Sequence, residues 1–462
     1  MLKLKDIKSV YFIGIGGIGM SALARFFKQQ GMNVAGYDRT PTPLTDTLKQ
    51  EGIEVRFDDD VESIPQTFKD KQSCLVVFTP AVPVTHAELQ YFKKNNFQVK
   101  KRAEVLGLLT RGMEGVCVAG THGKTTISSM TAHLMKQSEV GCNAFLGGIT
   151  RNYATNFLLD EHSSYVVMEA DEFDRSFLHL TPHLALVSAM DADHLDVYGE
   201  ASKVYEAFNE FVQLISPGGA LLYKEGLPLE LPDDDVEVFT YSAKEEGDFY
   251  PFNLKLVDGL YKFSLKTPFG KIHHLKMGVP GLLNVENAVG AIGLSLLAGV
   301  DEDEIREALP NFKGIRRRFE YRIREENLVY IDDYAHHPEE INATVASVRA
   351  LYPGKQLTVV FQPHLFTRTR DFADGFAEAL DKCDRVFLLD IYPAREEPIE
   401  GVTSQMIVDR MQLEKVKLLK YYDLKEELKS DVPEVILTLG AGDIDKLTDD
   451  LEGHLKLFIF NE

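Results

Sequence analysis

The sequence predicts an α/β protein of three domains, each built around a largely parallel sheet. Short apolar runs alternate with amphipathic stretches along most of the chain, which is the pattern of repeated strand–helix units. At roughly 100–200 residues per domain, 462 residues correspond to about three domains. Two glycine-rich loops each stand between an apolar run and a helical stretch, where such folds bind phosphate groups.

We expect a Rossmann-like N-terminal domain over 1–106, a central domain with a P-loop ATPase-like mixed sheet over 107–313, and a Rossmann-like C-terminal domain over 314–462. Within the central domain, residues 219–277 alternate apolar and polar side chains and carry a hairpin signal at Asp258-Gly259, which predicts an antiparallel flank. The expected strands are 9–13, 33–37, 75–79, 116–119, 165–168, 184–188, 328–331, 357–361, 386–389 and 435–439, and the expected helices include 18–30, 125–136 and 285–297.

The composition excludes several classes of function. A formal net charge of −21 argues against broad binding to nucleic acid or to an anionic membrane. The chain has no run of 18 apolar residues and no N-terminal signal sequence. The four cysteines are far apart and form no CxxC pair, so we expect reduced, mostly buried thiols. These features predict a cytoplasmic protein without nucleic-acid or membrane partners, and we expect a monomer or weak homodimer.

The first glycine loop has the pattern G-x-G-x-x-G and follows the first strand; its members are Gly14, Ile15, Gly16, Gly17, Ile18 and Gly19. Glycines let the backbone approach a pyrophosphate, and the following helix supplies free N–H groups. Asp38 ends the next strand, where an acid binds a ribose hydroxyl in dinucleotide folds. The motif alone leaves three alternatives open: NAD, a UDP-sugar, or a tight turn without a ligand.

The second loop follows the strand at 116–119 and opens a helix; its members are Gly120, Thr121, His122, Gly123, Lys124, Thr125 and Thr126. Backbone N–H groups here would hold the phosphates of ATP, Lys124 would reach the β- and γ-phosphates, and Thr125 would bind Mg²⁺. Only two residues separate Gly120 from Gly123, fewer than in the standard P-loop. The loop therefore belongs to a separate class of phosphate-binding turn.

Acidic residues follow two further strands of the central domain. Glu169, Asp171 and Glu172 end one strand, and Asp191, Asp193 and His194 end the other. Carboxylates beside a phosphate loop suit Mg²⁺, which prefers oxygen ligands, whereas histidine is an unusual ligand for that ion. A solvated loop is the simpler interpretation of any single acid among them.

The third domain carries two polar clusters. Arg316, Arg317 and Arg318 stand together near its start, either as a solvated boundary segment or as a phosphate clamp. Strand ends then carry the run from Asp332 to Pro338, which includes Tyr334, His336 and His337, and the run from Gln362 to Arg370. We expect substrate contacts rather than zinc because the two histidines are adjacent. We also expect Arg368 to hold a carboxylate and Arg370 to form an exposed ion pair.

With these motifs in view, the chain resembles the Mur ligase family along essentially its whole length. GIGGIGM at 14–20, GTHGKTT at 120–126, EADE at 169–172, ADH at 192–194, PGLLNVENA at 280–288, GIRRRFE at 314–320, DDYAHHP at 332–338 and FQPHLFTRTR at 361–370 occur in that family's order. Together these motifs are highly specific, and the first loop with DDYAHHP resembles the members that add L-alanine.

The resemblance implies a role for each of these motifs. The Gly14–Gly19 loop would bind the UDP part of UDP-N-acetylmuramate rather than NAD. ATP would be bound by the second loop with Asn284, Asn287, Arg318 and Asp332, and the metal by Thr125, Glu169 and His194. L-alanine would lie near Tyr334, His336 and Arg368. The catalytic set would be Lys124, Glu169, His194 and Arg318.

Three positions depart from the family pattern. Leu283 replaces a frequent histidine, Ala189 lies where an asparagine is frequent, and Leu365 replaces a frequent arginine. By rough register Asn209 stands where sister ligases carry a carbamylated lysine, so we expect no such modification.

The family reaction transfers the γ-phosphoryl group of ATP to the lactyl carboxylate, and the amine of the amino acid then displaces phosphate. Two interpretations from other classes stay open: an NAD-dependent oxidoreductase and a non-catalytic nucleotide switch. A related ligase that recycles murein peptides is a third alternative.

Overall fold

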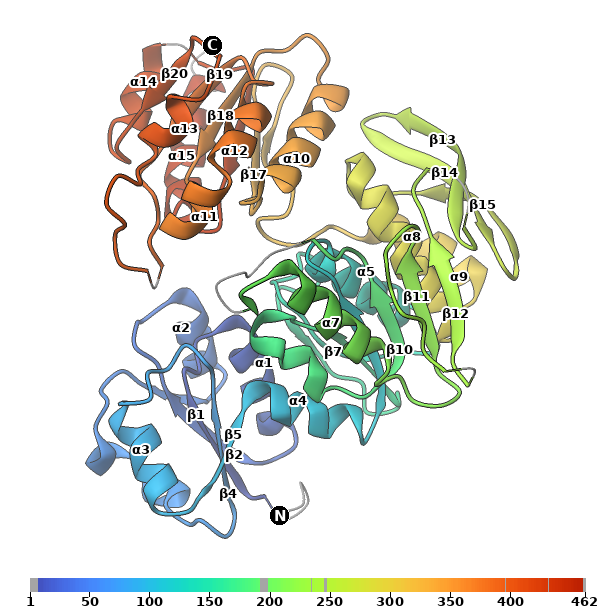
Figure 1. The fold of residues 1–462 in the computed structure, drawn as a ribbon, viewed down its shortest axis with the longest axis vertical. Coiled ribbons are helices and arrows are strands. Elements are labelled where there is room, and N and C mark those ends of the chain that lie inside the picture. Colours follow the sequence, from blue (N-terminus) through green and yellow to red (C-terminus); the bar gives the residue numbers. More distant parts are fainter. Residues whose placement is uncertain are drawn as a thin grey trace. The chain divides into compact units, whose positions relative to one another are not determined.

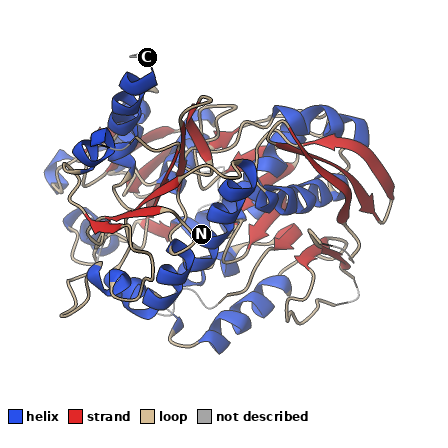
Figure 2. Cartoon of the chain, turned by 90° about the horizontal axis from the view of Figure 1, so that it is seen from above, coloured by secondary structure: helices blue, strands red, loops and turns tan. Residues whose placement is uncertain are grey.

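The computed structural model describes residues 7–191, 198–233, 235–244, 247–394, 396–430 and 432–459 (Figure 1). The chain divides into two compact units. One comprises residues 1–254, 263–275 and 286–312, and the other comprises residues 255–262, 276–285 and 313–462. Strands form four sheets, and helices lie beside the strands of the three larger ones (Figure 2). The predicted α/β class is confirmed.

The N-terminal sheet is entirely parallel, in the order β3-β2-β1-β4-β5. Its strands are β1 (Ser9–Ile13), β2 (Asn33–Tyr37), β3 (Glu54–Arg56), β4 (Cys74–Phe78) and β5 (Gln98–Lys101), and its helices are α1 (Ile18–Gln29), α2 (Pro43–Gln50), α3 (Ala87–Lys94) and α4 (Arg102–Thr110). The connections leave β1 and β4 to opposite sides. The carboxyl ends of β1 and β4 therefore mark the switch point at which such sheets bind ligands.

The central sheet has the order β12-β11-β10-β6-β9-β7-β8 and is parallel except for the edge pair β7·β8. Its strands are β6 (Glu114–Ala119), β7 (Asn143–Phe145), β8 (Phe157–Leu158), β9 (Tyr165–Glu169), β10 (Pro182–Val187), β11 (Ala220–Lys224) and β12 (Glu237–Tyr241), and its helices are α5 (Lys124–Lys136), α7 (Ala201–Val212), α8 (Leu282–Leu297) and α9 (Glu302–Ala308). Strand β6 lies between β9 and β10. The loop after β6 and the acids after its two neighbours therefore meet at one edge.

The predicted antiparallel flank over 219–277 is only partly right. Strands β11 and β12 continue the parallel sheet, with β12 at its edge and only partly buried. The separate sheet is a meander of β13 (Tyr250–Val257), β14 (Leu260–Thr267) and β15 (Gly270–Lys276), joined by two-residue turns. The first turn is the predicted Asp258-Gly259, with φ values of 54° and 75°.

The C-terminal sheet has the order β16-β17-β21-β18-β19-β20, with only β16 antiparallel to its neighbour. Its strands are β16 (Glu320–Arg324), β17 (Val329–Asp333), β18 (Leu357–Phe361), β19 (Arg385–Leu388), β20 (Val416–Leu418) and β21 (Val435–Leu439). Its helices are α10 (Pro338–Leu351), α11 (Phe366–Asp371), α12 (Ala373–Leu380), α13 (Gln405–Val408), α14 (Leu424–Ser430) and α15 (Asp445–Ile459). Strand β21 separates β17 from β18, which brings three polar strand ends together.

The helices and the cysteines of the chain bear on two of the sequence expectations. In the ranges given above, no helix combines the length and apolar character needed to cross a bilayer. All four cysteines are buried free thiols, as predicted. Burial raises the pKa of the Cys74 thiol to about 11 and that of Cys142 and Cys383 to about 12, so these thiols stay protonated at neutral pH.

Two helical glycines provide a matched test of this packing. A Cβ at Gly107 in α4 would overlap the backbone carbonyl of His179 in the 3₁₀ segment Phe173–His179, whereas a Cβ at Gly453 in α15 would have open space. Alanine favours a helix interior by about 1 kcal/mol over glycine, but overpacking costs about 1–3 kcal/mol. We expect Gly107→Ala to lower the midpoint of thermal unfolding by calorimetry, and Gly453→Ala to leave it equal or higher. Equal midpoints for the two variants would contradict this packing.

Candidate functional site

The Gly14–Gly19 loop lies at the switch point of the N-terminal sheet. Gly14 has φ of +90°, and a Cβ there would lie 2.7 Å from Cγ2 of Thr79, so the turn requires glycine. Asp38 accepts hydrogen bonds from the Gly16 amide at 2.7 Å and the Thr40 amide at 3.2 Å. This carboxylate therefore fixes the loop, while a ribose contact stays a prediction. Gly17 is the N-cap of α1, so Ile18 and Gly19 present the helix N-terminus.

Arg102 connects this loop to the central domain, and the sequence interpretation missed it. A Cβ at Gly19 would overlap the Arg102 guanidinium, which also lies 3.4 Å from the Asp171 carboxylate. Its neighbour Lys101 forms an ion pair with Asp174 at 2.8 Å. The two cations thus link the N-terminus of α4 to the acidic segment after β9. Only the basic run KKR at 100–102 could have drawn attention to them.

The loop after β6 has the backbone geometry of a phosphate-binding turn. Gly120 has φ of +133° and Gly123 has φ of +82°, values that side chains disfavour. Helix α5 begins at Lys124, so Thr125 and Thr126 lie in its first turn. A Cβ at Gly123 would lie 3.0 Å from the Asn287 amide oxygen, which places Asn287 beside the loop as expected. Asn284 donates a hydrogen bond to the Pro280 carbonyl at 2.6 Å and falls within the other compact unit.

Lys124 is held by a buried carboxylate rather than left in solvent. Its Nζ lies 2.7 Å and 2.9 Å from the two carboxylate oxygens of Glu172 and 2.7 Å from the Gly120 carbonyl. Burial by itself would lower the pKa of Lys124, but the carboxylates of Glu172, Asp171 and Glu169 raise it, so the amine is charged. Glu172 is thus paired with the ammonium group that is expected to contact phosphate.

The expected metal ligands Thr125 and Glu169 lie together. The Thr125 hydroxyl donates to Oε2 of Glu169 at 2.9 Å. A Cβ at Gly147 would overlap the Glu169 carboxylate, so the Glu169 side chain requires glycine at this position. The sequence interpretation missed Gly147. A hydroxyl and a carboxylate beside a phosphate loop are oxygen donors that suit Mg²⁺. The third expected ligand, His194, lies outside the described residues, as does Asp193.

The strand end after β10 also contacts the loop. The Thr121 hydroxyl donates to the Asp191 carboxylate at 3.2 Å, and the His122 ring lies 3.3 Å from the same carboxylate. The Ser188 hydroxyl donates to the Ala119 carbonyl at 3.2 Å and to the His122 carbonyl. The structure therefore brings both acidic strand ends to the loop, as their convergence on β6 requires.

The expected amino-acid residues of the third domain lie near one another. The His336 ring lies 5.3 Å from that of Tyr334 and 5.9 Å from that of His364, measured between centroids. Burial, with a further contribution from the Arg368 charge, lowers the pKa of His336 to about 4, so its imidazole is neutral at pH 7. Arg368 is buried beside His336. Its guanidinium stays charged at neutral pH, whereas the His336 imidazole does not. Arg370 forms an exposed ion pair with Asp371 at 2.7 Å, as predicted.

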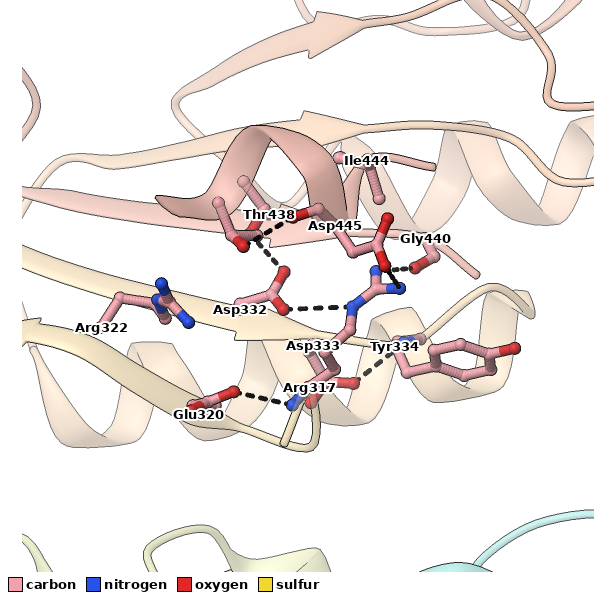
Figure 3. Close-up of polar contacts among 12 residues, drawn as sticks. Arg317, Glu320, Arg322, Asp332, Asp333, Tyr334, Thr438, Gly440, Ile444 and Asp445 are labelled. Atoms are coloured by element: carbon pink, nitrogen blue, oxygen red, sulfur yellow. Dashed lines mark hydrogen bonds and ion pairs between the residues drawn. The ribbon is translucent and has the colours of Figure 1, made fainter. Parts of the chain in front are cut away.

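Arg318 and Asp332 have different surroundings, and Figure 3 shows those of Asp332. The Arg318 guanidinium lies 4.9 Å from the ring centroid of Tyr334. Asp332 is only 1% exposed, and its oxygens lie 2.6 Å from the Thr438 hydroxyl and 3.3 Å from Arg317 Nε. Asp332 thus has partners within its own domain, and a contact between Asp332 and ATP stays a prediction.

The Lys124–Glu172 ion pair yields a test by nucleotide binding. Glu172→Gln removes the anion that competes with phosphate for Lys124. A hydrogen bond to a charged group contributes about 1 kcal/mol more than a neutral one, so we expect ATP to bind roughly 5–10-fold more tightly by calorimetry. Glu210→Gln, which alters an exposed partner of Arg175, is the matched control and should change nothing. An unchanged dissociation constant in Glu172→Gln would show that Glu172 does not compete.

Comparison with known proteins agrees with this arrangement. The chain matches the family profiles described as Mur ligase family, catalytic domain over residues 9–113, Mur ligase middle domain over 118–295, and Mur ligase, glutamate ligase domain over 317–443. A UDP-N-acetylmuramate–L-alanine ligase of Phocaeicola vulgatus is 49% identical, with 98% of this chain and 100% of that protein covered. The protein of the same name from Porphyromonas gingivalis strain W83 is 50% identical, over 97% and 99%.

Solved structures extend the comparison to the fold. A UDP-N-acetylmuramate-alanine ligase of Thermotoga maritima superposes with a TM-score of 0.81 at 27% identity, over 98% of this chain and 100% of that one. A murein peptide ligase of Psychrobacter arcticus shares the fold, with a TM-score of 0.69 at 20% identity over 97% and 98%. Because three family profiles match in order along most of its length and its relatives are about half identical to it from end to end, this chain belongs to the Mur ligase family.

Proposed function

We propose that this chain joins L-alanine to the lactyl carboxylate of UDP-N-acetylmuramate at the expense of ATP, a step of peptidoglycan precursor synthesis. One observation carries the proposal: a charged lysine on a phosphate-type loop lies between two acidic strand ends, in a chain whose full-length relatives bear that enzyme's name. An NAD-dependent oxidoreductase would not require the Gly120–Thr126 loop or the carboxylates after β9 and β10. We further propose a cytoplasmic monomer or weak homodimer.

The proposed division of labour follows the sheets. The loop from Gly14 to Gly19 and Asp38 take the UDP-sugar, whereas Tyr334, His336 and Arg368 take L-alanine. ATP is assigned to the following residues: Gly120, Thr121, His122, Gly123, Lys124, Thr125, Thr126, Asn284, Asn287, Arg318 and Asp332. Mg²⁺ is assigned to Thr125, Glu169 and His194, and when bound it neutralises charge on the transferred phosphoryl group.

In the proposed reaction a carboxylate oxygen of the lactyl group attacks the γ-phosphorus of ATP, the bond to ADP breaks, and an acyl phosphate forms. The alanine amine then attacks the acyl carbon, loses a proton, and expels phosphate to give the amide. We assign Lys124 to the transferred phosphoryl group and Arg318 to ATP as a second positive charge. The protein chiefly positions three anionic groups, which are ATP, the lactyl carboxylate and the UDP part of the sugar nucleotide, and offsets their mutual repulsion.

The proposal is tested by phosphate release. We expect release only when ATP, Mg²⁺, UDP-N-acetylmuramate and L-alanine are all present, and Lys124→Ala should lower the rate by roughly 100–1,000-fold because one electrostatic contact is lost. Substituting a murein tripeptide for alanine distinguishes a recycling ligase. Turnover of NAD with a hydroxy acid, or near-normal release by Lys124→Ala, would contradict the assignment.

Arg368 is tested separately as the alanine carboxylate partner. A guanidinium binds a carboxylate through two parallel hydrogen bonds, which lysine cannot reproduce. Arg368→Lys should therefore raise the Michaelis constant for alanine roughly 10–150-fold, while calorimetric binding of UDP-N-acetylmuramate changes little. Arg370→Lys, at an exposed ion pair on the same helix, is the control. If Arg368→Lys weakens the UDP-sugar and spares alanine, Arg368 belongs to the muramyl side.

A further inference from the structure

The three arginines at 316–318 are not equivalent in the structure. Arg316 is exposed, and the Arg318 guanidinium lies over the Tyr334 ring. The Arg317 side chain is only 18% exposed and points into the C-terminal domain between β17 and β21 (Figure 3). A common phosphate-clamping role for the cluster does not account for this inward orientation.

The Arg317 guanidinium joins two strand ends. Its Nε lies 3.3 Å from the Asp332 carboxylate at the end of β17. Nη2 donates to the Gly440 carbonyl at 2.6 Å, and Nη1 donates to the Gly442 carbonyl at 3.5 Å, both in the loop after β21. Asp445, at the start of α15, lies 4.0 Å away. A forked guanidinium can reach all of these partners at once, whereas a lysine ammonium cannot.

The Arg317 backbone is fixed as firmly as its side chain. Its amide donates to Glu320 at 2.8 Å, and its carbonyl accepts from the Tyr334 amide at 2.7 Å. The φ angles of Arg317 and Phe319 are 60° and 46°, left-handed values that a non-glycine residue adopts only where its surroundings impose them. The Phe319 amide is held by Asp333 at 2.9 Å. Together these contacts set the conformation of the segment that carries Arg318.

We infer that Arg317 is a positioning residue for ligation: it ties the 315–319 segment to the ends of β17 and β21 and so holds Arg318 and Tyr334 where ATP and alanine are bound. Arg317 itself contacts no substrate. This role rests on the proposed function, because Arg318 and Tyr334 are assigned through it. The buried Asp332 carboxylate, which is also assigned to ATP, holds the guanidinium from the end of β17.

The experiment compares Arg317→Ala, Arg317→Lys, Arg318→Ala and the double variant Arg317→Ala/Arg318→Ala, with the exposed Arg316→Ala as the control. Steady-state phosphate release is measured with each substrate varied in turn, and circular dichroism and thermal unfolding report folding. We expect both Arg317 variants to lower kcat/KM for ATP and for alanine by about 10–100-fold, as misplaced groups do, while the Michaelis constant for UDP-N-acetylmuramate and the Arg316→Ala kinetics stay normal.

The double variant decides how Arg317 acts. If it works through Arg318, Arg317→Ala should have far less effect when Arg318 is already alanine. The inference is overturned if the two losses multiply, if Arg317→Lys is fully active, or if the variants merely lose active enzyme with unchanged Michaelis constants. An inactive wild-type chain would instead refute the proposed function, so the two failures are distinguishable.

Discussion

A parallel sheet brings the carboxyl ends of its strands to one edge, and this constraint decides where chemistry can occur in the chain. At that edge the backbone leaves the hydrogen-bonded ladder, so amides and short polar side chains become available to a ligand. The Gly14 loop, the Lys124 loop and the Asp332–Tyr334 segment all follow such strand ends. The order of strands then selects which loops meet: β6 between β9 and β10, and β21 between β17 and β18.

Cations near these strand ends are paired with carboxylates of the protein. The chain is strongly acidic, yet the proposed reaction requires three anionic groups, which are ATP, the lactyl carboxylate and UDP, to be bound together. Lys124, Arg102 and Arg317 each lie against carboxylates of the protein itself. These carboxylates keep the cations in place, and for Lys124 the carboxylate occupies the position that a phosphate is expected to take. When phosphate binds at that loop as proposed, it therefore exchanges with the Glu172 carboxylate instead of filling an empty position.

The sequence predicted the bounds of strands better than it predicted which strands and side chains contact one another. Strands 9–13, 33–37, 357–361 and 435–439 have the expected bounds because continuous apolar runs identify buried parallel strands without further information. Strands β11 and β12 were misread because local alternation of apolar and polar residues does not show whether the neighbouring strand is parallel or antiparallel. The sequence predicted carboxylates beside the Gly120–Thr126 loop but not the strand order that places β6 between β9 and β10.

Arg102, Glu172, Gly147 and Arg317 show why the rest of the site could not be predicted. Each gains its meaning from a residue distant in sequence: Gly19, Lys124, Glu169 and Gly440 respectively. Local periodicity contains no information about such pairs. The sequence marked the 316–318 cluster as unusual but could not tell which arginine points inward, since that depends on the left-handed φ at Arg317.

The four buried, protonated thiols have a practical consequence for the study of motion. Maleimide and similar probes react with thiolates at the surface, and each natural cysteine here is shielded from solvent with a raised pKa. The natural chain should therefore be nearly silent to such labels without any cysteine being removed. A single cysteine introduced into each compact unit, for example at exposed Val84 and exposed Tyr422, would accept a donor and an acceptor dye. Fluorescence energy transfer could then follow the two units through a catalytic cycle in a chain whose core is otherwise unaltered.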